Sequence, residues 1–94
     1  MMTMIARHLL ITGQVQGVFY RNWTVQTARD LNLAGWVRNK ADGRVEAWVE
    51  GAPEAVELFI QRAHEGPPAA RVANIDSAEV APEGLTTFDK RPTA

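Results

Sequence analysis

Between residues 13 and 21 the chain reads Gly13-Gln14-Val15-Gln16-Gly17-Val18-Phe19-Tyr20-Arg21. This stretch follows a short apolar run at residues 9–11 and precedes a segment with helical periodicity, so it connects a strand to a helix. Its two glycines allow a tight turn and let an anion approach the backbone closely. Successive backbone N–H groups in such a turn form a concavity that binds anions, and the helix adds the positive end of its dipole. The stretch therefore predicts a loop that binds a phosphate group.

Arg21 stands at the start of the expected helix and strengthens this hypothesis. Its planar guanidinium carries a fork of N–H donors that fits two phosphate oxygens at once. A glycine-containing connection between a strand and a helix is, however, more often only a turn. The hypothesis of a functional site therefore needs a second feature, which the predicted fold supplies.

The periodicity of the chain predicts two helices, four strands and a short fifth strand. The four strands are expected at residues 7–12, 35–39, 45–50 and 72–80. The first helix is expected at residues 21–31, and the second begins at Pro53 and ends before Gly66-Pro67-Pro68. Residues 86–94 are expected to add the fifth strand and then to fray at Arg91-Pro92.

The order strand–helix–strand–strand–helix–strand predicts an α+β fold, the ferredoxin-like split βαβ sandwich (βαββαβ). Two helices would cover one face of an antiparallel sheet, and residues 1–94 would form a single domain with its core at about residues 6–90. In this topology the first and second strands run in the same direction and end at the same edge of the sheet. Asn39, which ends the second strand, should therefore face the Gly13–Arg21 loop across that edge.

The third expected strand, at residues 45–50, indicates whether the protein could bind a nucleic acid. Alternation places Trp48 on the uncovered face of the sheet, together with Glu46 and Glu50. Exposed aromatic side chains on some sheets of this kind stack on RNA bases, but the two carboxylates would repel phosphates. The net charge of −1 also lacks the basic character of a nucleic-acid binder. We therefore expect no nucleic-acid partner.

The composition excludes several kinds of site. The chain has no cysteine, which rules out disulfides, thiolate metal sites and a cysteine nucleophile. His8 and His64 lie on separate elements without a third ligand at a useful spacing, so no metal is expected. The start of the chain is too short and too weakly apolar for a secretion signal, and no run reaches membrane-spanning length. We expect a cytoplasmic monomer that does not act at a membrane.

Two motifs of this chain resemble those of the acylphosphatase family. Residues 13–21 match the phosphate-loop motif G-x-V-Q-G-V-x-[FY]-R, and Gly35-Trp36-Val37-Arg38-Asn39 matches G-[FYW]-[AVC]-[KRQ]-N, with the Asp42-Gly43 turn after it. The resemblance continues through Gly66-Pro67-Pro68 and Arg71-Val72 and covers roughly residues 6–90. It implies the ferredoxin-like fold and the hydrolysis of small-molecule acyl phosphates to a carboxylate and inorganic phosphate, without metal or organic cofactor.

The resemblance also implies roles for individual residues. Arg21 would bind the substrate phosphate, and Asn39 would hold the attacking water. A phosphate oxygen of the substrate itself would accept the proton of that water. The backbone amides that bind phosphate would be those of Gln14, Val15, Gln16, Gly17, Val18, Phe19 and Tyr20.

Two other interpretations use the same fold. A non-catalytic module could bind a phosphorylated metabolite in the loop without hydrolysing it. Larger hydrogenase-maturation proteins carry an acylphosphatase-like domain at one end, although the short length of this chain favours a free-standing domain. The cations Arg38, Lys40 and Arg44 are expected to be solvated surface charges, with steering of an anionic substrate as the alternative.

Overall fold

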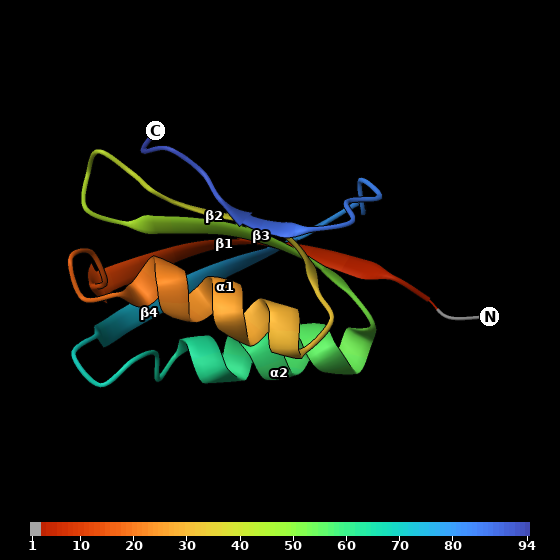
Figure 1. The fold of residues 1–94 in the computed structure, drawn as a ribbon, viewed down its shortest axis with the longest axis horizontal. Helices are drawn as coiled ribbons and strands as arrows, with labels where there is room; N and C mark the ends of the chain where they lie inside the picture. Colours follow the sequence, from red (N-terminus) through yellow and green to blue (C-terminus); the bar gives the residue numbers. More distant parts are fainter. Residues whose placement is uncertain (1–2) are drawn as a thin grey trace.

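The computed structural model describes residues 3–94, which form two helices and a five-stranded sheet. The elements are, in chain order, β1 (Ile5–Gln14), α1 (Tyr20–Asp30), β2 (Ala34–Asn39), β3 (Val45–Gly51), α2 (Pro53–Ala63), β4 (Arg71–Val80) and β5 (Phe88–Lys90). Both helices lie against the same face of the sheet (Figure 1). No helix in the described part of the chain is long and apolar enough to cross a membrane.

The sheet has the strand order β4-β1-β3-β2-β5. β1 pairs antiparallel with β3 and β4, and β2 pairs antiparallel with β3, which confirms the predicted ferredoxin-like arrangement of these four strands. β5 then adds to the edge of the sheet in parallel with β2, so the complete sheet is mixed. The expected elements are all present, and their ends differ from the predicted ones by only a few residues.

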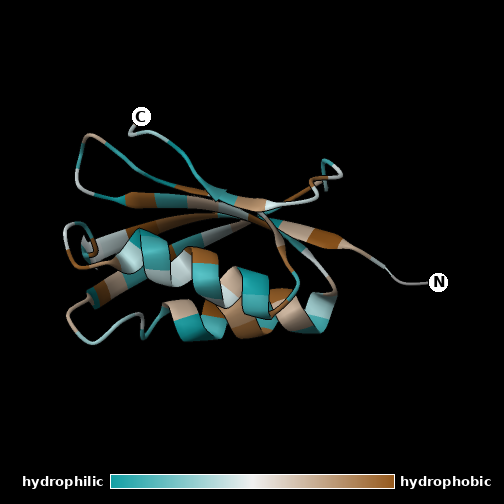
Figure 2. Cartoon of the chain, viewed as in Figure 1, coloured by the Kyte–Doolittle hydropathy of each residue, from teal (hydrophilic) through white to brown (hydrophobic). Residues whose placement is uncertain are grey.

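The hydrophobic core fills the space between the helices and the sheet. Leu9, Ala47 and Val37 lie side by side in three neighbouring strands, and all three are fully buried. Phe59 of α2 packs against Phe88 of β5 on this face, with ring centroids 6.1 Å apart. Figure 2 shows hydrophobic and hydrophilic residues along both helices, as expected for helices that cover a sheet on one side.

Tyr20 joins the two helices at the end of the sheet where α1 begins. Its hydroxyl group donates a hydrogen bond to the carbonyl oxygen of Ala63 at the end of α2 (2.7 Å). Burial raises the pKa of Tyr20 far above its usual value, so the hydroxyl stays neutral and remains a donor. This contact fixes the first turn of α1 relative to the rest of the core.

The uncovered face of the sheet is less exposed than alternation predicts. Glu46 and Glu50 are 7% and 1% exposed, although the pattern of β3 placed both in solvent. Glu46 accepts hydrogen bonds from His8 Nε2 and Arg38 Nε, each at 2.6 Å. Burial raises the pKa of Glu46, but these two hydrogen bonds outweigh that effect and the net pKa is lower than usual. The carboxylate therefore stays charged between its two partners.

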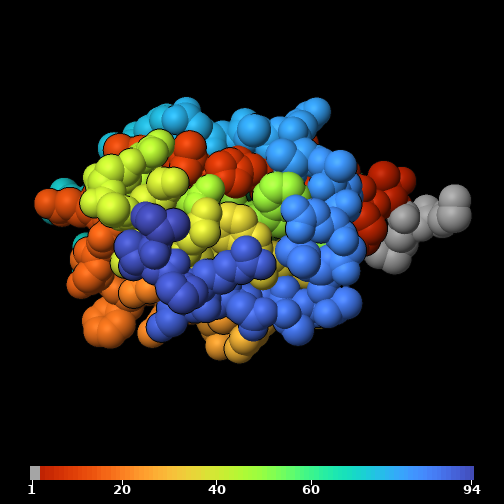
Figure 3. All heavy atoms as spheres, turned by 90° about the horizontal axis from the view of Figure 1, so that it is seen from above, coloured from red at the N-terminus to blue at the C-terminus, as the bar shows by residue number. Residues whose placement is uncertain are grey.

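The prediction that the chain frays at Arg91-Pro92 is wrong. Arg91 N–H donates to the carbonyl oxygen of Val37 (2.8 Å), and Ala94 N–H donates to that of Asn39 (3.0 Å). The Arg91 guanidinium lies over the Trp36 ring, 4.7 Å from its centroid. Figure 3 shows the C-terminal residues lying across the neighbouring strand on this side of the molecule. The segment stays ordered because β2 offers it both backbone partners and an aromatic surface.

Glu50 holds the connection between β4 and β5 against the sheet. Its carboxylate accepts hydrogen bonds from Trp48 Nε1 (2.8 Å) and from the backbone N–H groups of Glu83 (3.0 Å) and Leu85 (2.7 Å). Burial alone would raise the pKa of Glu50, but the hydrogen bonds together lower it below its usual value. The charged form is therefore the one that the fold stabilises.

We predict that Glu50→Gln lowers the free energy of unfolding by about 2 kcal/mol at pH 7, because the amide cannot accept all three hydrogen bonds. The folded-state pKa is the lower one, so the contribution of Glu50 is complete above about pH 4.5 and is lost as the pH falls through the lowered value. Urea unfolding of both proteins at several pH values measures this. The difference between them should shrink in acid, and the exposed substitution Glu65→Gln should have little effect.

Candidate active site

The pairing of β3 with two neighbours brings the candidate residues to one edge of the sheet. Val45 at the start of β3 is paired with Ile11 of β1 on one side and with Asn39 of β2 on the other. β1 and β2 therefore end at the same edge, as predicted, and the loop of residues 15–19 leaves β1 there. In Figure 1 this loop and the turn between β2 and β3 lie at the same end of the molecule.

The loop of residues 15–19 leaves its backbone N–H groups without protein acceptors. Among the described residues, none of these five N–H groups donates a hydrogen bond to a protein atom. Gly17 and Phe19 have φ angles of 70° and 65°, which turn the chain tightly. Helix α1 then begins with no side-chain cap on Phe19 and no acidic residue in its first turn. The loop therefore offers free donors beside the positive end of a helix dipole.

Gly13 allows the chain to enter this loop. Its φ angle is 131°, and a Cβ atom on it would lie 2.2 Å from the carbonyl oxygen of Arg71 in β4. The register between β1 and β4 shifts at Thr12/Gly13, which is a β-bulge. A larger residue would thus push β1 away from β4 directly before the loop.

Gln16 connects the loop to the turn that follows Asn39. Its side-chain Nε2 donates to the carbonyl oxygens of Lys40 and Arg44, both at 2.8 Å. The sequence predicted a phosphate-binding amide at Gln16, but it gave no sign of this side-chain contact. The two hydrogen bonds fix the distance between the loop and the end of β2.

Asn39 carries a buried polar atom without a partner. Its side-chain Oδ1 is inaccessible to solvent and accepts no hydrogen bond from any described residue. A buried acceptor of this kind normally has a partner, and each exception needs a physical reason. The side chain of Asn39 lies on the helix-facing side of the sheet, because it is two residues after the fully buried Val37 in the same strand.

Arg21 lines a small pocket of about 280 Å³ at this edge. The other lining residues are Gly17, Phe19, Asn22 and Lys90. Phe19 is 78% exposed, so its ring stands at the surface of the pocket. Among the described residues, no carboxylate lies within 4.0 Å of the Arg21 guanidinium. Arg21 is therefore available to bind an anion.

The side chains of the predicted loop residues divide into two groups. Those of Val15 and Tyr20 are buried in the core and anchor the two ends of the loop. The side chains of Phe19 and Arg21 line the pocket instead. Arg38 and Arg44, considered for substrate steering, are paired with Glu46 and Asp42 at 2.6 and 2.7 Å. Each of these two cations therefore has a carboxylate partner, whereas Lys40, the third cation considered, has none within 4.0 Å among the described residues.

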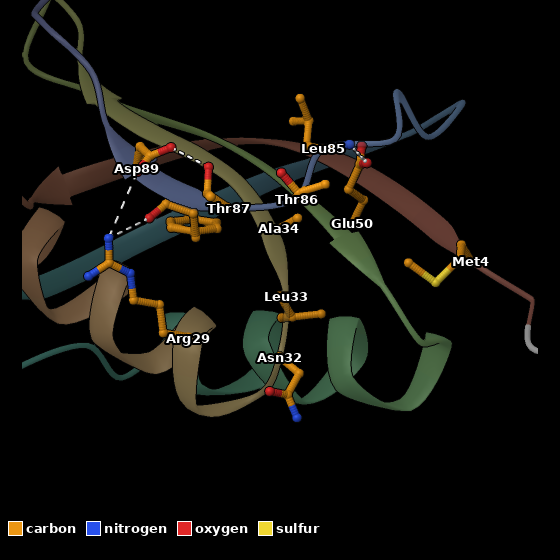
Figure 4. Close-up of a pocket in the computed structure, with 11 residues that line it drawn as sticks. Met4, Arg29, Asn32, Leu33, Ala34, Glu50, Leu85, Thr86, Thr87 and Asp89 are labelled. Atoms are coloured by element: carbon orange, nitrogen blue, oxygen red, sulfur yellow. Dashed lines mark hydrogen bonds and ion pairs between the residues drawn. The ribbon is translucent and has the colours of Figure 1, made fainter.

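Another pocket, of about 570 Å³, lies at the opposite end of the sheet (Figure 4). Its charged groups have partners within the protein: Asp89 accepts from Thr87 Oγ1 at 2.6 Å and lies 3.8 Å from Arg29. Glu50 holds the backbone of Leu85 there. These contacts attach β5 and the segment before it to the rest of the fold. Among residues 3–94, no three His, Asp or Glu side chains gather in a way that could hold a metal ion.

The family model described as acylphosphatase matches residues 7–90. An acylphosphatase from Acidovorax sp. (strain JS42) is 51% identical, and the match covers 95% of this chain and 92% of the relative. The chain belongs to the acylphosphatase family. It is accordingly a hydrolase that converts acyl phosphates to a carboxylate and inorganic phosphate, and its substrate is a small-molecule acyl phosphate.

Solved structures agree with this assignment. The structure of an acylphosphatase from Coxiella burnetii has a TM-score of 0.91 and 34% identity, and the match covers 94% of this chain and 93% of that one. The structure of HypF from T. kodakarensis has a TM-score of 0.82 and 35% identity over 93% of this chain, but only 12% of HypF is matched. The same acylphosphatase fold therefore occurs both alone and within a much longer chain.

We predict that Gln16→Ala weakens binding of inorganic phosphate about tenfold, because the loop loses the two hydrogen bonds that hold it beside β2. The inhibition constant of phosphate in an acyl phosphate hydrolysis assay measures this. Gln61→Ala, on the exposed surface of α2, is the matched control and should leave the constant unchanged. An unchanged constant in Gln16→Ala would show that the loop keeps its shape without the bridge.

Proposed function

We propose that the loop amides of residues 14–20 and Arg21 bind the phosphate of the substrate, and that Asn39 holds the attacking water. The observation that carries this proposal is the buried, unpartnered Oδ1 of Asn39 at the edge where the loop lies. An acceptor without a protein partner is suited to a hydrogen bond from water, and in this proposal the side chains that cover Oδ1 move aside to admit that water. The neighbouring N–H groups without acceptors are suited to an anion.

Phosphate binding in this proposal relies on preorganised donors. The N–H groups of the loop and the Arg21 guanidinium face the charge that spreads over the non-bridging oxygens in the transition state. Arginine offers two parallel N–H groups to two oxygens, which fixes the orientation of the phosphoryl group as well as its position. The loop needs no conformational change to present these donors, because Gln16 already holds it against the turn after β2.

The attacking water would donate one hydrogen bond to Oδ1 of Asn39, which directs its oxygen towards phosphorus. A P–O bond forms to the water oxygen, and the P–O bond to the acyl oxygen breaks. The electron pair of the broken bond leaves with the carboxylate, and the proton of the water passes to a phosphoryl oxygen. A neutral asparagine serves here because its amide only orients the water and accepts no proton.

Few groups suffice because the substrate is already activated. The leaving group is a carboxylate, which is stable without protonation near pH 7. Among the described residues, no Asp, Glu or His lines the pocket that contains Arg21. Rate enhancement would then come from positioning and from stabilisation of charge, which together supply several kcal/mol of barrier reduction.

The location, the oligomeric state, the cofactors and the partners of the enzyme are also part of this proposal. We infer that the chain acts as a single-domain cytoplasmic monomer, without metal or cofactor, and that it has no nucleic-acid partner. The net charge of −1 and the pairing of Arg38 and Arg44 with carboxylates support the absence of a nucleic-acid partner, because a nucleic-acid binder usually carries a strongly basic surface. Activity in the presence of EDTA tests the independence from metal.

We predict that Arg21→Ala and Arg21→Lys both lower kcat/KM for benzoyl phosphate by about 100-fold or more, because neither side chain offers the bidentate fork. Steady-state kinetics and inhibition by inorganic phosphate measure the loss. Arg62→Ala, which removes an exposed arginine of α2, is the control and should remain active. Near wild-type activity in both Arg21 variants would disprove the phosphate-binding role.

We predict that Asn39→Ala lowers kcat by about 100-fold or more, while the inhibition constant of phosphate changes less than twofold. The reason is that the variant loses the orientation of the water but keeps the loop and Arg21. Asn74→Ala, at an exposed position of β4, is the matched control. Loss of phosphate binding with an unchanged kcat would instead make Asn39 a substrate contact, and tight phosphate binding without any wild-type turnover would favour the non-catalytic module.

A further inference from the structure

Lys90 of β5 is a second cation in the pocket that contains Arg21. The pocket is lined by both side chains, together with Gly17, Phe19 and Asn22. The Nζ atom of Lys90 donates a hydrogen bond to Oδ1 of Asn22 in the first turn of α1 (3.2 Å). This contact holds the ammonium group next to the start of the helix, one residue from Arg21.

The register of the sheet explains why Lys90 points towards the pocket. Lys90 is paired with Val37 of β2, whose side chain is fully buried on the helix-facing side. Phe88, two residues earlier in β5, packs against α2 on the same side. Because side chains alternate along a strand, Lys90 also projects to the helix-facing side, where Asn39 lies two residues beyond Val37.

Neither cation of the pocket is neutralised by a carboxylate of the protein. Among residues 3–94, no Asp or Glu oxygen lies within 4.0 Å of the charged nitrogen atoms of Arg21 or Lys90. Arg29, Arg38 and Arg44 each have such a partner. The partner of Lys90 is the neutral amide of Asn22, which orients the ammonium group without cancelling its charge.

We propose that Lys90 is a specificity-determining residue that binds a second negative charge on the acyl group of the substrate. The inference rests on the proposed function, in which the loop amides and Arg21 already bind the phosphate. The preferred substrates are then acyl phosphates whose acyl group carries a carboxylate or a second phosphate. A charge on the acyl group that reaches Lys90 gains a charge-assisted hydrogen bond that a neutral acyl group lacks.

Phe19 completes this subsite with an apolar surface. Its ring is 78% exposed and lines the same pocket as Lys90. Its φ angle of 65° is unusual for an aromatic residue, so the surrounding fold must offset the backbone strain. The pocket thus offers an apolar wall to the carbon chain of an acyl group and a cation to its end.

A pair of substrates of equal length tests this directly. Adipoyl monophosphate and hexanoyl phosphate have the same carbon chain, and a carboxylate in the first replaces a methyl group in the second. We expect Lys90→Gln to lower kcat/KM for adipoyl monophosphate by about 3- to 10-fold and that for hexanoyl phosphate by less than twofold. Lys90→Arg, which keeps the positive charge, should retain most of the wild-type preference for adipoyl monophosphate over hexanoyl phosphate.

Two controls separate a local contact from a change in overall charge. Arg62→Gln removes one positive charge from an exposed position of α2 that does not line the pocket, and should leave the ratio of the two kcat/KM values unchanged. The inhibition constant of inorganic phosphate should also stay within twofold in Lys90→Gln, since phosphate occupies the loop and not the subsite. Added salt should reduce the effect of Lys90→Gln on adipoyl monophosphate.

An equal loss of kcat/KM for both substrates in Lys90→Gln, or no loss for either, would overturn the proposal. An equal loss would mean that Lys90 binds the phosphoryl group or steers all anions alike. Failure of the proposed function looks different: the wild-type protein would then hydrolyse neither substrate, or Arg21 variants would retain full activity. The two hypotheses are therefore separated by the same set of measurements.

Discussion

The pairing of β3 with both β1 and β2 is the constraint on which the site depends. Val45 lies between Ile11 and Asn39, so the ends of β1 and β2 meet at one edge of the sheet. The side chain of Gln16 then ties the loop after β1 to the turn after β2. A shift of one residue in this register would turn Asn39 to the uncovered face and separate it from the loop. The position of the candidate site, and the set of residues that meet there, thus follow from the pairing of the strands.

The fold and the backbone part of the site could be predicted from the sequence because both follow local rules. Alternation in β3 and helical periodicity in α1 specify the layers, and the glycines of the Gly13–Arg21 stretch indicate the tight loop between β1 and α1. The burial of Glu46 and Glu50 could not be predicted in this way. Their partners, such as His8 and the backbone of Leu85, are far away in the sequence, and a glutamate in an alternating pattern indicates solvent.

The C-terminal segment shows the same limit. A short polar stretch that ends in Arg91-Pro92 favours fraying when it is considered alone. In the folded protein it pairs with the edge of β2 and covers Trp36, because β2 would otherwise be an exposed edge strand. This pairing also brings Lys90 to the pocket of Arg21. Contacts between segments that are far apart in the sequence depend on the complete topology, and a motif within one segment does not reveal them.

The central claim is that a water held by Asn39 attacks the phosphorus atom of a phosphoryl group bound by the loop and Arg21. Hydrolysis of benzoyl phosphate in water enriched in oxygen-18 tests this most directly, with mass spectrometry of both products after a single turnover. The account predicts that the label appears in inorganic phosphate and that benzoate contains none. Label in benzoate would show attack on the acyl carbon and would contradict the proposed roles of the loop and of Asn39.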